Sequence, residues 1–204
     1  MGIEKDAMRG AGFTDGDQPG SWIDPRGIPV DLMVPDAIAG PGGRRGARIP
    51  PHSRRAARRA AGLEAAVTDR TQMAIASLSP HDPRVITANV AGPTALLVAK
   101  LHKLGERQAT PERLMNKDAH DVYRLLVAVP LDQFTDTFHT LLADGMAGKV
   151  TTQALDYLNL LFAAGPNALG SSMAGRTELG LGDPDVVAAS CTALANDILT
   201  ALSH

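Results

Sequence analysis

The sequence predicts an α+β protein in which a small, mostly antiparallel sheet precedes an α-helical C-terminal half. Short alternating or apolar runs, bounded by Gly and Pro, occupy residues 1–92. From 93 to 204 the apolar residues follow the 3.6-residue period of α-helices instead. A chain of 204 residues can bury one good core, or one core with a small appendage. We therefore expect a β-rich region over 1–92 and a helical region over 93–204.

Composition excludes several classes of protein. The only cysteine, Cys191, excludes a disulfide framework and a cysteine-based zinc site, and it is expected to be a small core residue. No apolar run approaches the roughly 18 residues of a membrane span, and the first residues lack the hydrophobic region of a signal peptide. Aromatic residues make up only 3% of the chain, which leaves little material for base-stacking platforms. We expect a cytoplasmic protein with no membrane partner.

The N-terminal region predicts a short helix, a hairpin and further strands. Residues 1–13 are expected to be the end of a helix, closed by glycines. Residues 21–34 are expected to form a hairpin, because Asp24, Pro25 and Gly27 occupy positions that a type I turn favours. Three more strands are expected over 63–68, 73–78 and 85–90.

The C-terminal region predicts helices only. Thr94, or a residue just before it, is expected to cap the first of these helices, and Thr110–Glu112 to begin the second with a proline in its first turn. After Pro130 the apolar spacing predicts three more helices, over about 131–143, 152–164 and 183–202.

Charged residues enter the apolar faces of the first two C-terminal helices. Lys100 falls inside the apolar stripe of the first helix, and Asp118 and Asp121 border the stripe of the second. They could form a structural ion-pair network or a site that handles phosphate and metal, and spacing alone favours the network. The two stripes consist of Leu96, Leu97, Leu101 and Leu104, and of Leu114, Val122, Leu125 and Leu126.

An arginine-rich loop occupies residues 40–62. Seven of the chain's twenty Lys and Arg residues lie between positions 44 and 59, with no acidic residue among them. Arginine forks bind phosphate oxygens bidentately, so the loop could hold a nucleotide or an RNA backbone. The alternative is a solvated loop whose arginines pair with acids elsewhere. The glycines of this loop do not have the spacing of a P-loop.

Three segments of the chain carry a family resemblance through their order and spacing: Val30–Val34, Ala99–Arg107 and Lys117–Val122. They resemble the later motifs of the nucleotidyltransferase-like proteins of the AbiEii type. These proteins are the toxin components of some bacterial toxin-antitoxin and abortive-infection systems. The resemblance implies a partial nucleotidyltransferase-like fold and Mg²⁺-dependent transfer of a nucleotide from a nucleoside triphosphate to an RNA or protein acceptor. It also implies an antitoxin protein as a partner.

The resemblance also implies roles for individual residues. Asp31, on the second strand of the hairpin, matches an acidic residue of the metal site. Lys100 matches a lysine that contacts the triphosphate, and Asp118, with Asp121 beside it, matches an acidic residue that positions the reacting groups or transfers a proton. These three, Asp31, Lys100 and Asp118, form the expected catalytic set. Contacts with phosphate are expected from Lys100, Lys103, Arg107, Lys117, Arg44 and Arg45.

The chain departs from the family pattern before Asp31. Family members open with a Gly-Ser motif, an arginine and an Asp-x-Asp pair, whereas Gly20-Ser21 is followed by no such pair. Two-metal transfer needs clustered carboxylates that hold metal ions about 4 Å apart, which one strand aspartate cannot supply. We therefore expect an N-terminally truncated or degenerate member that is inactive or weak alone. The alternative is a noncatalytic interaction module in which the Lys–Asp cluster is structural.

Overall fold

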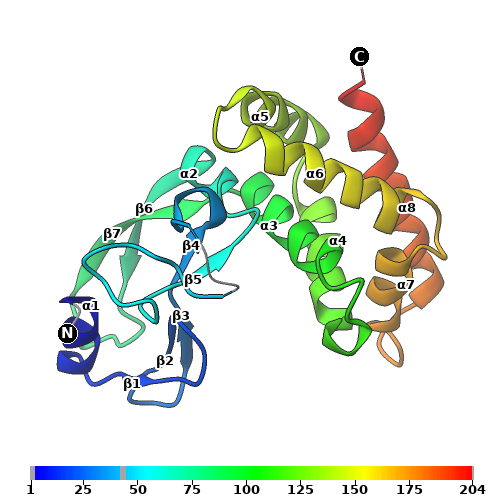
Figure 1. Ribbon diagram of the computed structural model, residues 1–204. Helices are drawn as coiled ribbons and strands as arrows, with labels where there is room; N and C mark the ends of the chain where they lie inside the picture. Colours follow the sequence, from blue (N-terminus) through cyan, green and yellow to red (C-terminus); the bar gives the residue numbers. More distant parts are fainter. Residues whose placement is uncertain (1–2, 42–44, 204) are drawn as a thin grey trace. The chain divides into compact units, whose positions relative to one another are not determined.

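The computed structural model describes residues 3–41 and 45–203, and it divides into two compact units, Met1–Leu63 and Glu64–His204 (Figure 1). The α+β class is confirmed: the strands are short and mostly antiparallel, and helices fill the C-terminal half. The last described strand ends at Ala91, and this strand and its partner belong to the second unit. Among the described residues, no helix combines the length and apolar character needed to cross a membrane.

The first unit contains the expected hairpin. Strand β2 pairs with β3 across a turn in which Asp24 Oδ1 accepts the backbone N–H groups of Arg26 and Ile28, each at 2.8 Å. The bond from Ile28 contributes most to lowering the pKa of Asp24. Trp22, in the middle of β2, is 1% exposed. The elements of this unit are α1 (Ile3–Gly10), β1 (Thr14–Asp15), β2 (Ser21–Ile23), β3 (Pro29–Asp31), β4 (Met33–Pro35), η1 (Asp36–Ile38) and β5 (Arg58–Ala60).

The second hairpin strand ends earlier than the sequence predicted. The antiparallel pairing stops at Asp31, and β4 then pairs in parallel with β5. Gly20 lies at this change of partner, since its C=O accepts the N–H of Leu32 at 2.7 Å and its N–H donates to the C=O of Arg55 at 2.9 Å. The expected continuous strand to residue 34 is therefore wrong, because a parallel partner more than twenty residues away takes over the pairing.

The second unit is built around one hydrophobic core. Helix α3 packs against α4 and α6, and α7 packs between α4 and α8. Cys191 of α8 is fully buried, as expected, and burial raises the pKa of its thiol to about 12. The elements are α2 (Ala65–Thr68), β6 (Arg70–Ala76), β7 (Val85–Ala91), α3 (Pro93–Gly105), η2 (Pro111–Arg113), α4 (Asn116–Ala128), α5 (Leu131–Ala143), α6 (Gly148–Leu158), the π-helical η3 (Asn159–Ala163), α7 (Leu169–Arg176) and α8 (Pro184–Ala201).

Several local predictions are wrong. The run 63–68 is not a strand, because its alanines form the one-turn helix α2, and a run this short has no decisive period. Helix α7 was not predicted, since its glycines and serines are weak helix formers. Burial of most of its residues against α4 and α8 stabilises it. Helix α6 begins at Gly148, four residues before the expected start, and Leu96 of α3 is 43% exposed rather than in the core.

The N-cap residue of α3 is Gly92, one of the residues just before Thr94, and it has no side chain that could accept a hydrogen bond from the helix. Thr94 is buried, and its hydroxyl has no hydrogen-bond partner among the described residues. Instead, Asp69 Oδ2 accepts the backbone N–H of Ala95 at 2.8 Å. A carboxylate at this end also interacts favourably with the helix dipole. A residue 26 positions away in sequence therefore fixes where α3 begins.

Gly105→Ala is expected to destabilise the second unit, although replacing glycine by alanine inside a helix usually stabilises by about 1 kcal/mol. An added Cβ would lie 2.4–2.5 Å from three ring atoms of Tyr157 on α6. The rigid ring cannot move aside without disturbing the α3–α6 packing, so we expect a net loss of about 1–2 kcal/mol. Urea denaturation followed by far-UV circular dichroism measures it. Gly145→Ala, where an added Cβ meets nothing within 4 Å, is the control and should cause no loss.

Candidate functional site

Three ion pairs join α4 to α3 and to the turn that follows α3. Lys100 Nζ lies 2.5 Å from Asp121 Oδ2. Lys103 Nζ lies 2.6 Å from Asp118 Oδ1, and Arg107 Nη1, in the turn after α3, lies 3.2 Å from Asp118 Oδ2. Both oxygens of Asp118 are therefore bound by cations, one on α3 and one in the turn after it.

The spacing of these residues explains the contacts. Lys100 and Lys103 are three residues apart on α3, and Arg107 follows four residues later in the turn after the helix. Asp118 and Asp121 are three apart on α4, so the two lysines lie on one face of α3 and the two aspartates on one face of α4. Because α3 packs against α4, the two faces meet and the charges pair in sequence. The sequence shows the same spacing, but it does not show which cation pairs with which carboxylate, because that depends on how the two helices pack. Lys103, expected only to contact phosphate, is a direct partner of Asp118.

The carboxylates differ in burial. The side chain of Asp118 is 1% exposed, whereas that of Asp121 is 37% exposed. The side chains of Lys100, Lys103 and Arg107 are between 23% and 37% exposed, so each is partly accessible to solvent beside the buried carboxylate. Three cations face two carboxylates, which leaves one net positive charge among these five side chains.

The expected catalytic residues are distributed over both units. Asp31 lies in the first unit, and Lys100 and Asp118 lie in the second. Within the second unit, Lys100 pairs with Asp121 rather than with Asp118. Lys117, expected to contact phosphate, is exposed on α4.

Asp31 is bound by an arginine of the arginine-rich loop. Its Oδ2 accepts Nη2 of Arg58 at 3.0 Å, and both side chains are partly exposed. The next arginine, Arg59, pairs with Asp36 at 2.6 Å. Within the part of the chain that the structure describes, no group of three His, Cys, Asp or Glu side chains could hold a metal ion. Arg44, one of the expected phosphate-binding residues, lies outside the described residues.

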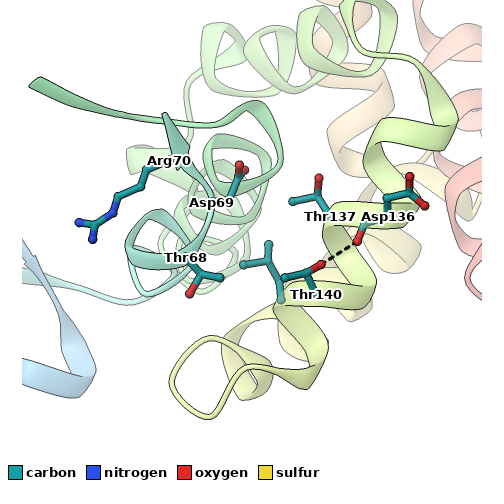
Figure 2. Close-up of a pocket in the computed structure, with 7 residues that line it drawn as sticks. Thr68, Asp69, Arg70, Asp136, Thr137 and Thr140 are labelled. Atoms are coloured by element: carbon teal, nitrogen blue, oxygen red, sulfur yellow. Dashed lines mark hydrogen bonds between the residues drawn. The ribbon is translucent and has the colours of Figure 1, made fainter. Parts of the chain in front are cut away.

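A small pocket of about 250 Å³ lies between the end of α2 and α5 (Figure 2). The hydroxyls of Thr137 and Thr140 donate to carbonyl oxygens of their own helix. Arg70 points away from α5 in Figure 2, and Asp69 caps α3. The polar groups do not converge on a common point, so the pocket is not the candidate site. Its lining residues are Thr68, Asp69, Arg70, Asp136, Thr137, Thr140 and Leu141.

A hydrogen bond beside this pocket links α2 to the start of α6. Thr68 Oγ1 donates to Asp144 Oδ2 at 3.0 Å, and Asp144 Oδ1 accepts the backbone N–H groups of Met146 and Ala147. These bonds, with that from Ala147 contributing most, lower the pKa of Asp144. Since Asp144 makes these bonds as a carboxylate, its role is structural.

The chain was compared with known proteins at three levels. Comparison with protein-family models, with curated proteins and with solved structures found no match to this chain. The resemblance to the AbiEii type therefore rests on the three sequence segments. Two of these segments supply the ion pairs between α3 and α4. Membership of that family stays a prediction.

Proposed function

We propose that the chain is a nucleotidyltransferase-like protein of the AbiEii type that binds a nucleoside triphosphate with Mg²⁺ along α3. One observation carries the proposal: Lys100 and Lys103 on α3, and Arg107 in the turn that follows it, are held side by side by Asp118 and Asp121. Their partly exposed side chains, and the excess of one positive charge, suit a polyphosphate.

The proposed roles follow from the charge and burial of each side chain. Lys100 contacts the triphosphate as a flexible point charge, and Arg107 presents a planar fork. Asp118 is a positioning residue, because its buried carboxylate fixes Lys103 and Arg107. Mg²⁺ would be supplied with the triphosphate, as is usual for nucleotide sites.

We propose that transfer to an RNA or protein acceptor is weak or absent in this chain by itself. Such transfer by two metal ions requires a cluster of carboxylates. In the described residues, Asp31 is paired with Arg58 and no three-acid cluster is present. An antitoxin protein remains a proposed partner on the basis of the family resemblance alone.

A second candidate function is a noncatalytic interaction module. Both oxygens of Asp118 are occupied and its side chain is 1% exposed, as in structural ion pairs that hold two helices together. In this case α3 and α4 serve as a rigid scaffold, and the cluster does not bind nucleotide.

Calorimetric titration of the full chain with ATP, GTP, CTP and UTP, with and without Mg²⁺, separates the two candidates. The first predicts saturable, Mg²⁺-dependent binding to at least one nucleotide, which Lys100→Ala weakens about tenfold or more. The fold should survive this change, because a partly exposed ion pair contributes at most about 1 kcal/mol.

The matched control is Lys149→Ala, which removes an exposed lysine from α6. It should leave nucleotide affinity unchanged. If no nucleotide binds, or if both variants weaken binding equally, nucleotide recognition by α3 is wrong and the interaction module is favoured. Circular dichroism of each variant verifies that the helices remain.

A further inference from the structure

The formal charge of the chain is divided unequally between its two units. Residues 1–63 carry ten Lys and Arg against seven Asp and Glu, a net charge of +3. Residues 64–204 carry ten Lys and Arg against fifteen Asp and Glu, a net charge of −5. A net charge of −2 for the whole chain therefore conceals a basic first unit. Such asymmetry is typical of proteins with a polyanionic partner.

Two arginines of the first unit donate hydrogen bonds to the turn at residues 16–18, where their acceptors carry no negative charge. Arg45 Nη1 donates to the side-chain oxygen of Gln18 at 3.0 Å. Arg55 Nη2 donates to the carbonyl oxygens of Gly16 and Asp17 at 3.3 and 3.2 Å. All three acceptors are neutral, so these hydrogen bonds do not compensate the positive charge of either guanidinium group. Each group also has further N–H donors. This contrasts with the pairing of Arg58 with a carboxylate.

A third arginine lies beside them. An added Cβ on Gly46 would lie only 2.3 Å from the carbonyl oxygen of Arg54, so these two backbone segments are in close contact. That contact places Arg54 and Arg55 next to the segment that carries Arg45. Arg54 is exposed, and it forms no ion pair with any described residue. We name Arg45, Arg54 and Arg55 the arginine triad.

We propose that the arginine triad binds the phosphodiester backbone of a nucleic acid. Guanidinium groups with free donors, whose hydrogen bonds go to neutral acceptors and not to carboxylates, are suited to contact successive phosphates. Arg48, also exposed, lies on the same segment as Arg45 and extends the charge. This surface belongs to the first unit, so the inference goes beyond nucleotide binding by α3 and can fail independently of it.

A nucleic acid fits this surface better than an acidic protein does. Protein interfaces are usually anchored by apolar or aromatic side chains. Ile49, the one large hydrophobic residue of the segment 45–59, is only partly exposed. Trp22, the only tryptophan of the chain, is buried and cannot stack on bases. Recognition should therefore depend on phosphate and not on base sequence.

Fluorescence anisotropy of the full chain tests the inference with labelled oligouridylate and oligodeoxythymidylate, each about 20 nucleotides long. We expect both to bind, with an affinity that falls steeply between about 50 and 200 mM salt. Replacing the whole triad by glutamine should reduce the slope of log affinity against log salt by about 2, since each lost phosphate contact removes roughly 0.7. Asp17→Asn removes a carboxylate beside the triad and should strengthen binding.

Arg26→Gln is the control for Arg54→Gln, because Arg26 is an exposed arginine of the same unit whose charge is paired with Asp24. Arg54→Gln should weaken binding several-fold and Arg26→Gln should not. Equal losses, a salt slope unaffected by the triad, or no binding at low salt would overturn the inference. Trp22 fluorescence verifies that each variant is folded. Lys100→Ala should leave this binding intact, so failure of nucleotide binding by α3 does not affect the result.

Discussion

Lys103→Met combined with Arg107→Met will lower the free energy of unfolding by about 3–5 kcal/mol. The double substitution leaves the carboxylate of Asp118, which is 1% exposed, without either of its cations. An unpaired buried charge costs far more than an unpaired charge that can reach solvent. Methionine keeps most of the side-chain volume, so the loss reports on charge and not on packing. Urea denaturation, followed by circular dichroism at 222 nm, measures the change.

Removing the carboxylate, and keeping both cations, should cost less stability. Asp118→Asn leaves two cations that are partly exposed and can be hydrated, so we expect a loss of about 1–2 kcal/mol. Combining all three substitutions should recover much of the stability lost in the double variant, because the isolated carboxylate is gone. If the double variant is as stable as Asp118→Asn, the carboxylate is not as desolvated as its burial indicates. Lys100→Met, next to the exposed Asp121, is the control and should cost under about 1 kcal/mol.

Gly20→Ala will unfold the first unit, or destabilise it by about 3 kcal/mol or more, while the second unit stays folded. Gly20 has a φ of +73°, which costs an L-residue with a side chain about 1–2 kcal/mol. An added Cβ would also lie 2.2 Å from the carbonyl oxygen of Leu32 and 2.7 Å from the backbone nitrogen of Arg58. Backbone atoms that themselves form hydrogen bonds cannot move away without breaking the pairing.

Two signals distinguish the units in this experiment. Trp22 is the only tryptophan, so its fluorescence reports on the first unit, whereas the far-UV signal of the long helices reports on the second. We expect a red-shifted tryptophan emission with the helical signal largely retained. Gly27→Ala is the control, since Gly27 has a φ of +86° but an added Cβ meets nothing within 4 Å. Loss of both signals together in Gly20→Ala would show that the two units unfold as one.

The long helices of the second unit were predictable because their evidence is local. Leu97, Leu101 and Leu104 repeat at helical spacing, and all three are buried in α3. Helix α5 begins and ends where its apolar period predicts. Helix α8 begins one residue after its predicted start, Asp183, which caps it by accepting two backbone N–H groups. The hairpin turn at Asp24 was predictable for the same reason, since the residue preferences of a type I turn concern only four consecutive residues.

The candidate site was only half predictable. Sequence spacing located Lys100, Asp118 and Asp121 at the edge of the apolar faces, and all three are in ion pairs between α3 and α4. Spacing could not predict the ion pair between Lys103 and Asp118, because this pair depends on how far α3 and α4 are shifted along one another. The role of Asp31 as a metal ligand stays a prediction; its observed partner is Arg58.

By itself the sequence determined the class of the fold, the bounds of α5 and the helical spacing of Lys100 and Lys103 on α3, because helix formation and amphipathic spacing are properties of neighbouring residues. Only the tertiary structure decided the partner of each charge, the capping of α3 by Asp69 and the parallel pairing of β4 with β5. It also decided that α7 is a helix, since packing against α4 and α8 overcomes the weak helix propensity of its residues. These outcomes depend on contacts between residues far apart in the chain, whose energies no local pattern contains.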